Sequence, residues 1–316
     1  MPETTSFAVN ERARHLETLA ATPAALKAAL RGVPRKLLLF TPAPGKWSIL
    51  EILCHLRDME REGYLERYTR ILAENEPRLP DLNGDAFAIE RDYRGQKAGD
   101  VLRDWARLRR ESLRLLKKSK PEQWRRAGIH ETAGRLTIDD LVVRHAVGND
   151  AAHLAQIDAI KRRAALLERL SAAPTALAAA LKGVPDDALR RRPTSGNWSM
   201  IENAAHVRDI ERVYQERFSK IAFSDSPAFW MLDNDRAAVR LKYAESDPAA
   251  VVKEFRRLRE DTLLLLRALP HAAWRRTGLH PKRGELTLEQ LAEVLAGHDD
   301  SHLGKIRELR EIAGQP

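Results

Sequence analysis

Three histidines in the second half of the chain have the spacing expected of metal ligands. His298 and His302 stand at positions i and i+4, so on a helix they project from one face about a turn apart. Two imidazoles at this spacing can hold one ion without bending the backbone, and His206 would supply a third from a neighbouring helix. Three neutral imidazoles leave coordination positions open for water or substrate, as catalytic sites do more often than structural ones.

An internal repeat extends this pattern over the whole chain. Each half carries a Trp-Ser pair before a His-x-Arg-Asp-x-Glu-Arg stretch, then a Trp-Arg-Arg-x-Gly-x-His stretch, and finally a segment that ends in His-Leu. The offset between the copies falls from 151 to 150 and then to 149, so two one-residue gaps separate them. The matching segments are Trp47–Arg61 and Trp198–Arg212, Trp124–His130 and Trp274–His280, and Gly148–Leu154 and Gly297–Leu303.

The first copy carries the same ligand pattern with one substitution. The equivalent positions are His55, Asn149 and His153. The amide oxygen of asparagine is a poor ligand for a borderline metal compared with imidazole. His145 lies one turn before Asn149 and is a further candidate, although its reach to His153 is long. We therefore interpret the first site as degenerate and the second as intact.

The polar residues near these histidines can each be interpreted in two ways. Asp58 and Asp209 follow the helix-two histidines by three residues, so they could accept a hydrogen bond from the imidazole and orient it. A salt bridge with a neighbouring arginine is the alternative. His130 and His280 lie in the Gly-x-His connection, where bracing of the chain is favoured over metal binding. Asp299 directly follows a ligand and faces elsewhere on its helix, so it is not assigned as a general base.

The order and spacing of these motifs give the chain a family resemblance. The residues that carry it are the Trp-Ser loop start, His206 with Asp209 and Glu211, Gly278-x-His280, and the run from His298 to Ile306. With these motifs in both halves, the chain resembles the DinB/YfiT-like superfamily of bacterial four-helix-bundle metalloproteins.

This resemblance implies a metal centre and a class of activity. One histidine from the second helix and an HxxxH pair from the fourth would bind a divalent transition metal, such as zinc, nickel or iron, through His206, His298 and His302. Members of the superfamily include thiol-dependent S-transferases and isomerases that use low-molecular-weight thiols. The resemblance implies a metal-dependent enzyme, a hydrolase or a thiol S-transferase, acting on a small-molecule substrate. The alternative is a non-catalytic metal-binding or stress-response module.

Four helices per copy are expected to position these residues. Leucines at helical spacing open each copy, and Val33-Pro34 and Val184-Pro185 stop the opening helices. Ser48 and Ser199 have the position of N-caps, with a glutamate three residues later. Third helices are predicted at roughly 98–118 and 248–268, and Thr137 and Thr287 can cap the fourth. The fold class is therefore all-α, with two tandem four-helix bundles, residues 1–163 and 164–316.

Composition limits the remaining classes of function. Hydrophobic residues make up 43% and charged residues 31% of the 316 residues, as in a globular protein. No apolar run suggests a membrane span or signal peptide, and the single cysteine, Cys54, fits a cytoplasmic protein. The net charge is +9, but the arginines alternate with acids at helical spacing, which argues against nucleic acid as a partner. We expect the two bundles to pair as an internal pseudo-dimer.

Overall fold

The computed structural model describes residues 3–193 and 197–314. Its contacts divide the chain into two compact units. The N-terminal unit comprises the chain up to Thr41 together with Trp47–Arg162, and the C-terminal unit comprises Pro42–Lys46 together with the chain from Arg163 onward.

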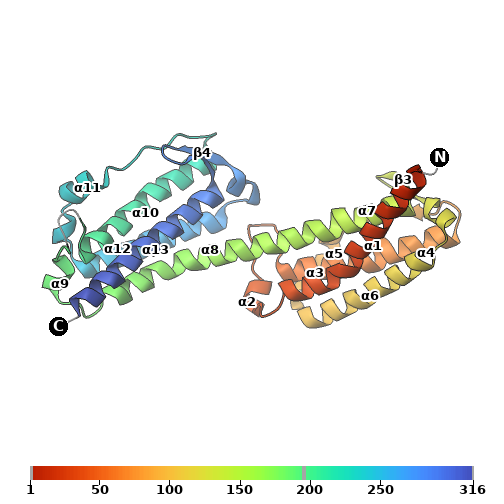
Figure 1. Cartoon of the computed structure of the whole chain (residues 1–316), viewed down its shortest axis with the longest axis horizontal. Coiled ribbons are helices and arrows are strands. Elements are labelled where there is room, and N and C mark those ends of the chain that lie inside the picture. Colours follow the sequence, from red (N-terminus) through yellow and green to blue (C-terminus); the bar gives the residue numbers. More distant parts are fainter. Residues whose placement is uncertain (1–2, 194–196, 315–316) are drawn as a thin grey trace. The chain divides into compact units, whose positions relative to one another are not determined.

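The N-terminal unit is a four-helix bundle (Figure 1). Its second and fourth helices are each interrupted by a π-helical segment. A buried core that includes Leu26, Leu53, Trp105 and Ile157 joins all four helices. The helices are α1 (Glu3–Ala29); α3 (Ile49–Asp58), η1 (Met59–Leu65) and α4 (Glu66–Ala73); α6 (Ala98–Lys118); and α7 (Ile138–Val143), η4 (Arg144–Ala151) and the start of α8 (Ala152–Leu181).

The C-terminal unit repeats this arrangement with uninterrupted helices. The remainder of α8 is its first helix, followed by α10 (Met200–Phe223), α12 (Pro248–Ala268) and α13 (Leu288–Ala313). Its buried core includes Leu177, Ile201, Phe255 and Ile306, one residue from each helix. The predicted all-α class with two tandem four-helix bundles is confirmed.

Local capping signals start the helices that carry the histidines. Ser48 and Ser199 accept hydrogen bonds from the backbone N–H groups of Glu51 and Glu202. The carboxylates of these glutamates in turn accept from the backbone N–H groups of the two serines. Thr137 and Thr287 cap α7 and α13 in the same way. Because each cap fixes where its helix begins, it also fixes which face the histidines project from.

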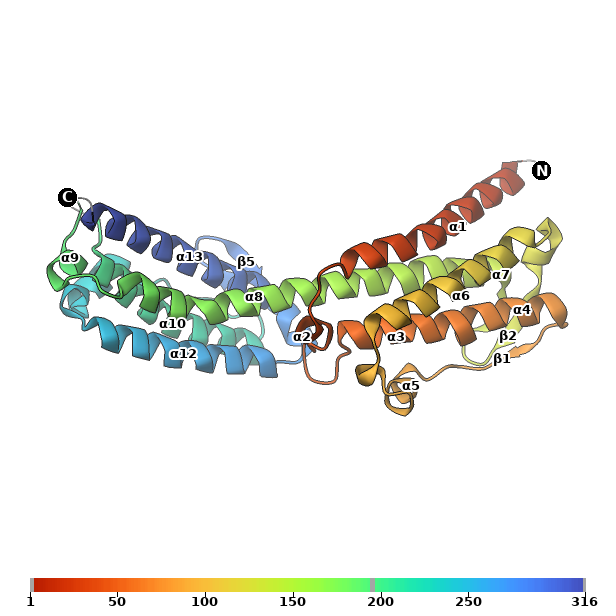
Figure 2. The same ribbon diagram turned by 90° about the horizontal axis from the view of Figure 1, so that it is seen from below.

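Short elements connect the long helices. A β-hairpin precedes the fourth helix in each unit, β2 (Ala127–His130) with β3 (Gly134–Thr137), and β4 (Thr277–His280) with β5 (Gly284–Thr287). Gly134 and Gly284 supply the positive φ of the hairpin turns, 72° and 73°. In Figure 2 the short strand β1 (Arg78–Leu79) lies beside β2, to which it pairs in parallel. The other connecting elements are α2 (Arg35–Leu38), α5 (Gly84–Glu90), η2 (Tyr93–Gly95), η3 (Pro121–Arg125), α9 (Asp186–Arg190), α11 (Asn234–Arg240), η5 (Tyr243–Glu245) and η6 (His271–Arg275).

The two one-residue gaps between the copies coincide with the two π-helical segments of the described chain. The first gap falls between the Arg61/Arg212 pair and the Tyr64/Tyr214 pair, inside η1. The second falls between the Thr137/Thr287 pair and Gly148/Gly297, an interval that includes the first half of η4. A π-helical turn bonds i to i+5 in place of i to i+4, so it takes up one extra residue while the helix continues on either side. The copies therefore keep equivalent helix faces despite the insertions.

One helical stretch is long and apolar enough to cross a membrane by length and composition alone. It is Ile138–Leu181, with a mean hydropathy of 1.2 over its most apolar window. From the sequence we expected no apolar run that suggests a membrane span, and this stretch departs from that expectation. Its apolar residues Ile157, Leu170 and Leu177 are each 0% exposed, and a core helix of a globular bundle passes the same test.

Candidate metal centre

The C-terminal bundle brings the three predicted histidines together. His206 comes from the first half of α10, and His298 and His302 come from adjacent turns of α13. One ring nitrogen from each lies within 4.8 Å of the others. Among the residues that the structure describes, this is the one group of three or more potential ligands so arranged.

The spacing of these nitrogens fits a shared ion. The Nε2 atoms of His206 and His298 are 3.0 Å apart. Two ligands at about 2.1 Å from one metal and at right angles to each other would be separated by roughly 3.0 Å. His302 presents Nδ1 to the amide oxygen of Asn203 at 2.7 Å. Since that oxygen only accepts, His302 donates from Nδ1 and keeps the lone pair on Nε2 for a ligand bond.

The charge state of the cluster also suits a metal. Burial, and then the proximity of the other two histidines, lowers the pKa of His206 to about 2. Burial and the neighbouring His298 lower the pKa of His302 to about 3. Both rings are therefore neutral at ordinary pH, which is the form that binds a metal.

A tryptophan and an open pocket border the cluster. The Trp198 ring lies 4.8 Å from the ring of His206, edge to face, and 6.3 Å from that of His302. The pocket has a volume of about 630 Å³, and its walls include all three histidines, Trp198 and Asn203. Neither Trp198 nor Asn203 is among the site residues predicted from the sequence. The Trp-Ser motif marks the first position, whereas no sequence signal marks the second.

The first copy keeps two of the three histidines close together. The rings of His55 and His153 are 5.0 Å apart. Asn149 is buried, and among the described residues its amide has a long contact of 3.5 Å with Asp150. The backbone at Gly84 covers His55 so tightly that a Cβ there would lie 2.9 Å from the ring Nδ1.

His145 belongs to a buried ion-pair network. Its Nε2 lies 2.9 Å from Glu60, and its ring stacks on Tyr64 at 3.7 Å. Arg109 crosses the core between Glu60 and Asp150, at 2.6 Å from each. The sequence left open whether His145 could approach His153; its described contacts are with this network.

The C-terminal bundle carries the same network without a histidine. Arg259 contacts Glu211 at 2.6 Å and Asp299 at 2.7 Å, and it donates to the carbonyl of Leu170. Asp299 therefore faces the core, away from the pocket, as its place beside His298 on the helix predicts. Arg259 ties all four helices of the bundle behind the histidine cluster.

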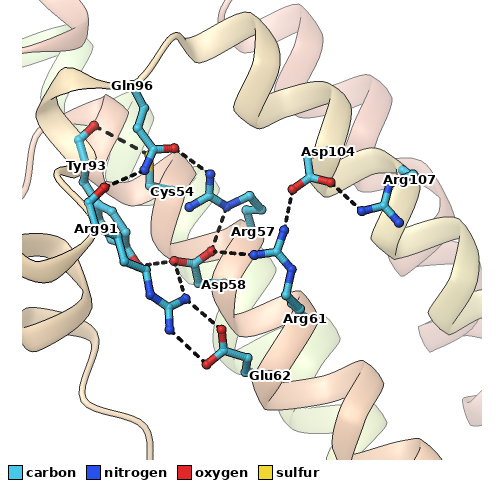
Figure 3. A network of polar contacts seen from close by, with 10 residues as sticks. All are labelled: Cys54, Arg57, Asp58, Arg61, Glu62, Arg91, Tyr93, Gln96, Asp104 and Arg107. Carbon is cyan, nitrogen blue, oxygen red and sulfur yellow. Dashed lines mark hydrogen bonds and ion pairs between the residues drawn. The ribbon is translucent and has the colours of Figure 1, made fainter.

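The two helix-two aspartates pair with arginines. Figure 3 shows Asp58 between Arg57, Arg91 and Tyr93, at 2.7, 2.9 and 2.8 Å. Asp209 accepts from Arg208 at 2.8 Å. Of the two readings of these aspartates, the described contacts correspond to the salt bridge.

The connection histidines brace the hairpin turns. His130 Nδ1 accepts from the N–H of Ala133 at 3.3 Å, and its Nε2 lies 3.4 Å from Asp81. His280 Nδ1 accepts from the N–H of Lys282 at 3.2 Å. Neither belongs to the three-nitrogen cluster.

A family model now accounts for both bundles. The model of the DinB superfamily matches residues 18–157 and again residues 169–306. The chain belongs to the DinB superfamily. The uncharacterized protein YuaE of Bacillus subtilis (strain 168) is 25% identical over 144 residues, which cover 42% of this chain and 88% of YuaE. A solved structure, YfiT from Bacillus subtilis, is described as a probable metal-dependent hydrolase with an unusual four-helix bundle topology. It is 22% identical, with a TM-score of 0.46, and the match covers 48% of this chain and 87% of YfiT.

Proposed function

We propose that the C-terminal bundle of this DinB-superfamily chain is a metal-dependent enzyme for a small-molecule substrate. The observation that carries the proposal is the convergence of three imidazoles on the wall of an open pocket. His206, His298 and His302 would hold one divalent transition metal, either zinc, nickel or iron. When bound, such a metal acts as a Lewis acid and activates a nucleophile by lowering its pKa.

The chain's own residues have distinct roles in this proposal. Asn203 fixes the tautomer and orientation of His302 through the 2.7 Å hydrogen bond. Trp198 covers one side of the cluster, so it limits water and offers an apolar surface to the substrate. Within the described structure, no Ser-His-Asp or Cys-His arrangement lies in the pocket wall, and Cys54 is buried in the other bundle. The reaction class is either hydrolysis or transfer to a low-molecular-weight thiol.

Metal content tests the proposal most directly. Protein purified without chelator should contain about one transition metal per chain by elemental analysis. His206→Ala should remove it, whereas His55→Ala, the matched change in the first copy, should leave it in place. The metal-loaded chain is then assayed on ester and amide substrates with and without an added thiol. A chain that takes up no metal after reconstitution would contradict the proposal. Metal binding without turnover would leave the non-catalytic metal-binding alternative.

A further inference from the structure

A second chamber adjoins the histidine cluster in the C-terminal bundle. It has a volume of about 830 Å³ and lies between α10, the β4–β5 turn and α13. His298 and Asn234 line both this chamber and the pocket described above. A molecule in the second chamber can therefore contact His298.

Basic groups gather in this chamber. Arg217 is 6% exposed and donates from Nη2 to the carbonyl of Trp230 at 2.9 Å. Its Nε is buried and has no partner among the described residues. A buried donor without a partner is unfavourable, and more so in a charged group. Lys282 and Arg283 line the same chamber from the turn.

His280 adds a further donor. Its Nδ1 accepts from the N–H of Lys282, so the neutral ring carries its proton on Nε2. Burial, followed by the positive charges of Arg217, Arg283 and Lys282, lowers the pKa of His280. The three cations thus act on one imidazole, and no carboxylate is among the described residues that line the chamber.

The first copy does not have the same concentration of positive charge. The equivalent chamber, lined by Arg67, His130 and Asn149, has a volume of only about 270 Å³. Asp81 lies 3.4 Å from His130 there, and Glu131 accepts from the Asp81 N–H at 3.1 Å.

Four replacements, three in the β4–β5 turn and one at Met231 in the chamber wall, each raise the charge by one unit in the second copy. The acids Asp81 and Glu131 become Met231 and Pro281, and Thr132 and Ala133 become Lys282 and Arg283. One further exchange, Arg144 to Val294, removes a positive charge from the second copy. The chamber is therefore most basic in the copy that has the complete histidine set.

We propose that this chamber binds the carboxylate or phosphate group of an anionic small-molecule substrate and so positions its reacting end at the histidine cluster. The guanidinium of Arg217 and the charges of the turn match a planar or tetrahedral oxyanion. The enclosing walls strengthen this attraction relative to an exposed surface. The binding step stands on the chamber alone; the positioning role rests on the proposed metal-dependent function.

The chain itself supplies the test variant. Lys282→Thr with Arg283→Ala gives the turn the residues of the first copy, where the same hairpin forms. The control, Lys253→Thr with Arg256→Ala, removes the same two charges from exposed positions of α12. Calorimetric titration of the full chain uses inorganic phosphate and succinate as probes, before and after chelator treatment. We expect the turn variant to bind the oxyanion about ten-fold more weakly or worse, and the control to bind as the original chain does.

The outcomes separate the two proposals. Phosphate or succinate bound by the chelator-treated chain, and lost in the turn variant, supports the anion chamber even if no metal is found. Stronger binding of phosphate than of succinate would assign a phosphorylated substrate, and the reverse a carboxylate. An affinity that is unchanged by the turn variant, or no binding of either probe, would overturn the chamber proposal and leave the metal proposal standing. Met231→Asp, which restores the acid of the first copy, must also weaken binding.

Discussion

Replacing Asn149 by histidine should give the first bundle a metal site. The rings of His55 and His153 are 5.0 Å apart, close to the 4.8 Å between His206 and His302. Only the third imidazole is missing. The Asn149 amide makes one long contact of 3.5 Å with Asp150, so its loss costs at most about 1 kcal/mol. The adjoining chamber of about 270 Å³ offers room for the larger ring.

The affinity of this site for a metal depends on how well His153 is held in place by a hydrogen bond. Asn203, which holds His302 in the second bundle, corresponds to Ile52, but Gln156 lies 3.0 Å from His153 Nδ1 and can hold that ring instead. At a free metal concentration of 100 times Kd, binding adds about 2.7 kcal/mol to stability. For a bundle of this size that amounts to a rise in Tm of about 5–10 °C.

The assay is metal stoichiometry together with thermal unfolding, with and without added Zn²⁺ or Ni²⁺. Asn149→His should raise the content from about one to about two metals per chain, and Asn149→Gln, which adds bulk without an imidazole, should not. The rise in Tm should appear only with metal. A stoichiometry that stays at one would refute the reasoning and would mean that the cover at Gly84 or the π-helical turn has changed the geometry of the site.

Four further outcomes are expected. His302→Ala should abolish metal binding by the original chain while His153→Ala leaves it intact, as elemental analysis would show. Asn203→Ile, the residue of the first copy, should weaken metal affinity by about 10- to 100-fold in a competition titration, because His302 loses its hydrogen-bond partner. Arg259→Met should destabilise the C-terminal bundle by about 3–5 kcal/mol in urea unfolding, since Glu211 and Asp299 would remain buried and unpaired; a loss below 1 kcal/mol would count against this. Burial opposes ionisation of Glu60, but the interactions with His145 and Arg109 outweigh it and lower its pKa to about 2. The stability that ionised Glu60 contributes is complete above its ordinary pKa of about 4.5 and is lost as the pH falls toward 2. In Glu60→Gln the free energy of unfolding should therefore depend less steeply on pH over that range.

Much of the fold could be predicted because its signals are local. The capping boxes at Ser48 and Ser199 and the threonine caps at Thr137 and Thr287 depend only on residues three apart. The short helices between the second and third long helices could not be placed, because Pro77, Pro80 and Gly84 indicate only irregular chain. The sequence alignment located both gaps, but the π-helical turns that absorb them depend on packing on both sides of the helix.

The candidate site, like the fold, has parts that the sequence predicts and parts that it does not. The spacing of His298 and His302 follows from one helix, so it could be read directly. The contacts of Asn203 with His302, and of Arg259 with Glu211 and Asp299, join different helices and depend on rotation about each axis. The readings of Asp58 and Asp209 were equally balanced for this reason, since three residues along a helix brings an aspartate near either the histidine or an arginine.

The two copies differ at the pocket and agree behind it. Arg109 and Arg259 join the same pair of acids in both cores, so the frame that holds the second and fourth helices together does not depend on a metal. Loss of a ligand at Asn149 therefore leaves the bundle folded, and the walls around it are free to diverge. They have done so together: the cover at Gly84 packs onto His55, the chamber beside Asn149 is small, and Thr132 and Ala133 stand where the second copy carries Lys282 and Arg283. The differences fall on the residues that a metal and an anionic substrate would contact, which is the distribution expected if only the C-terminal bundle binds both.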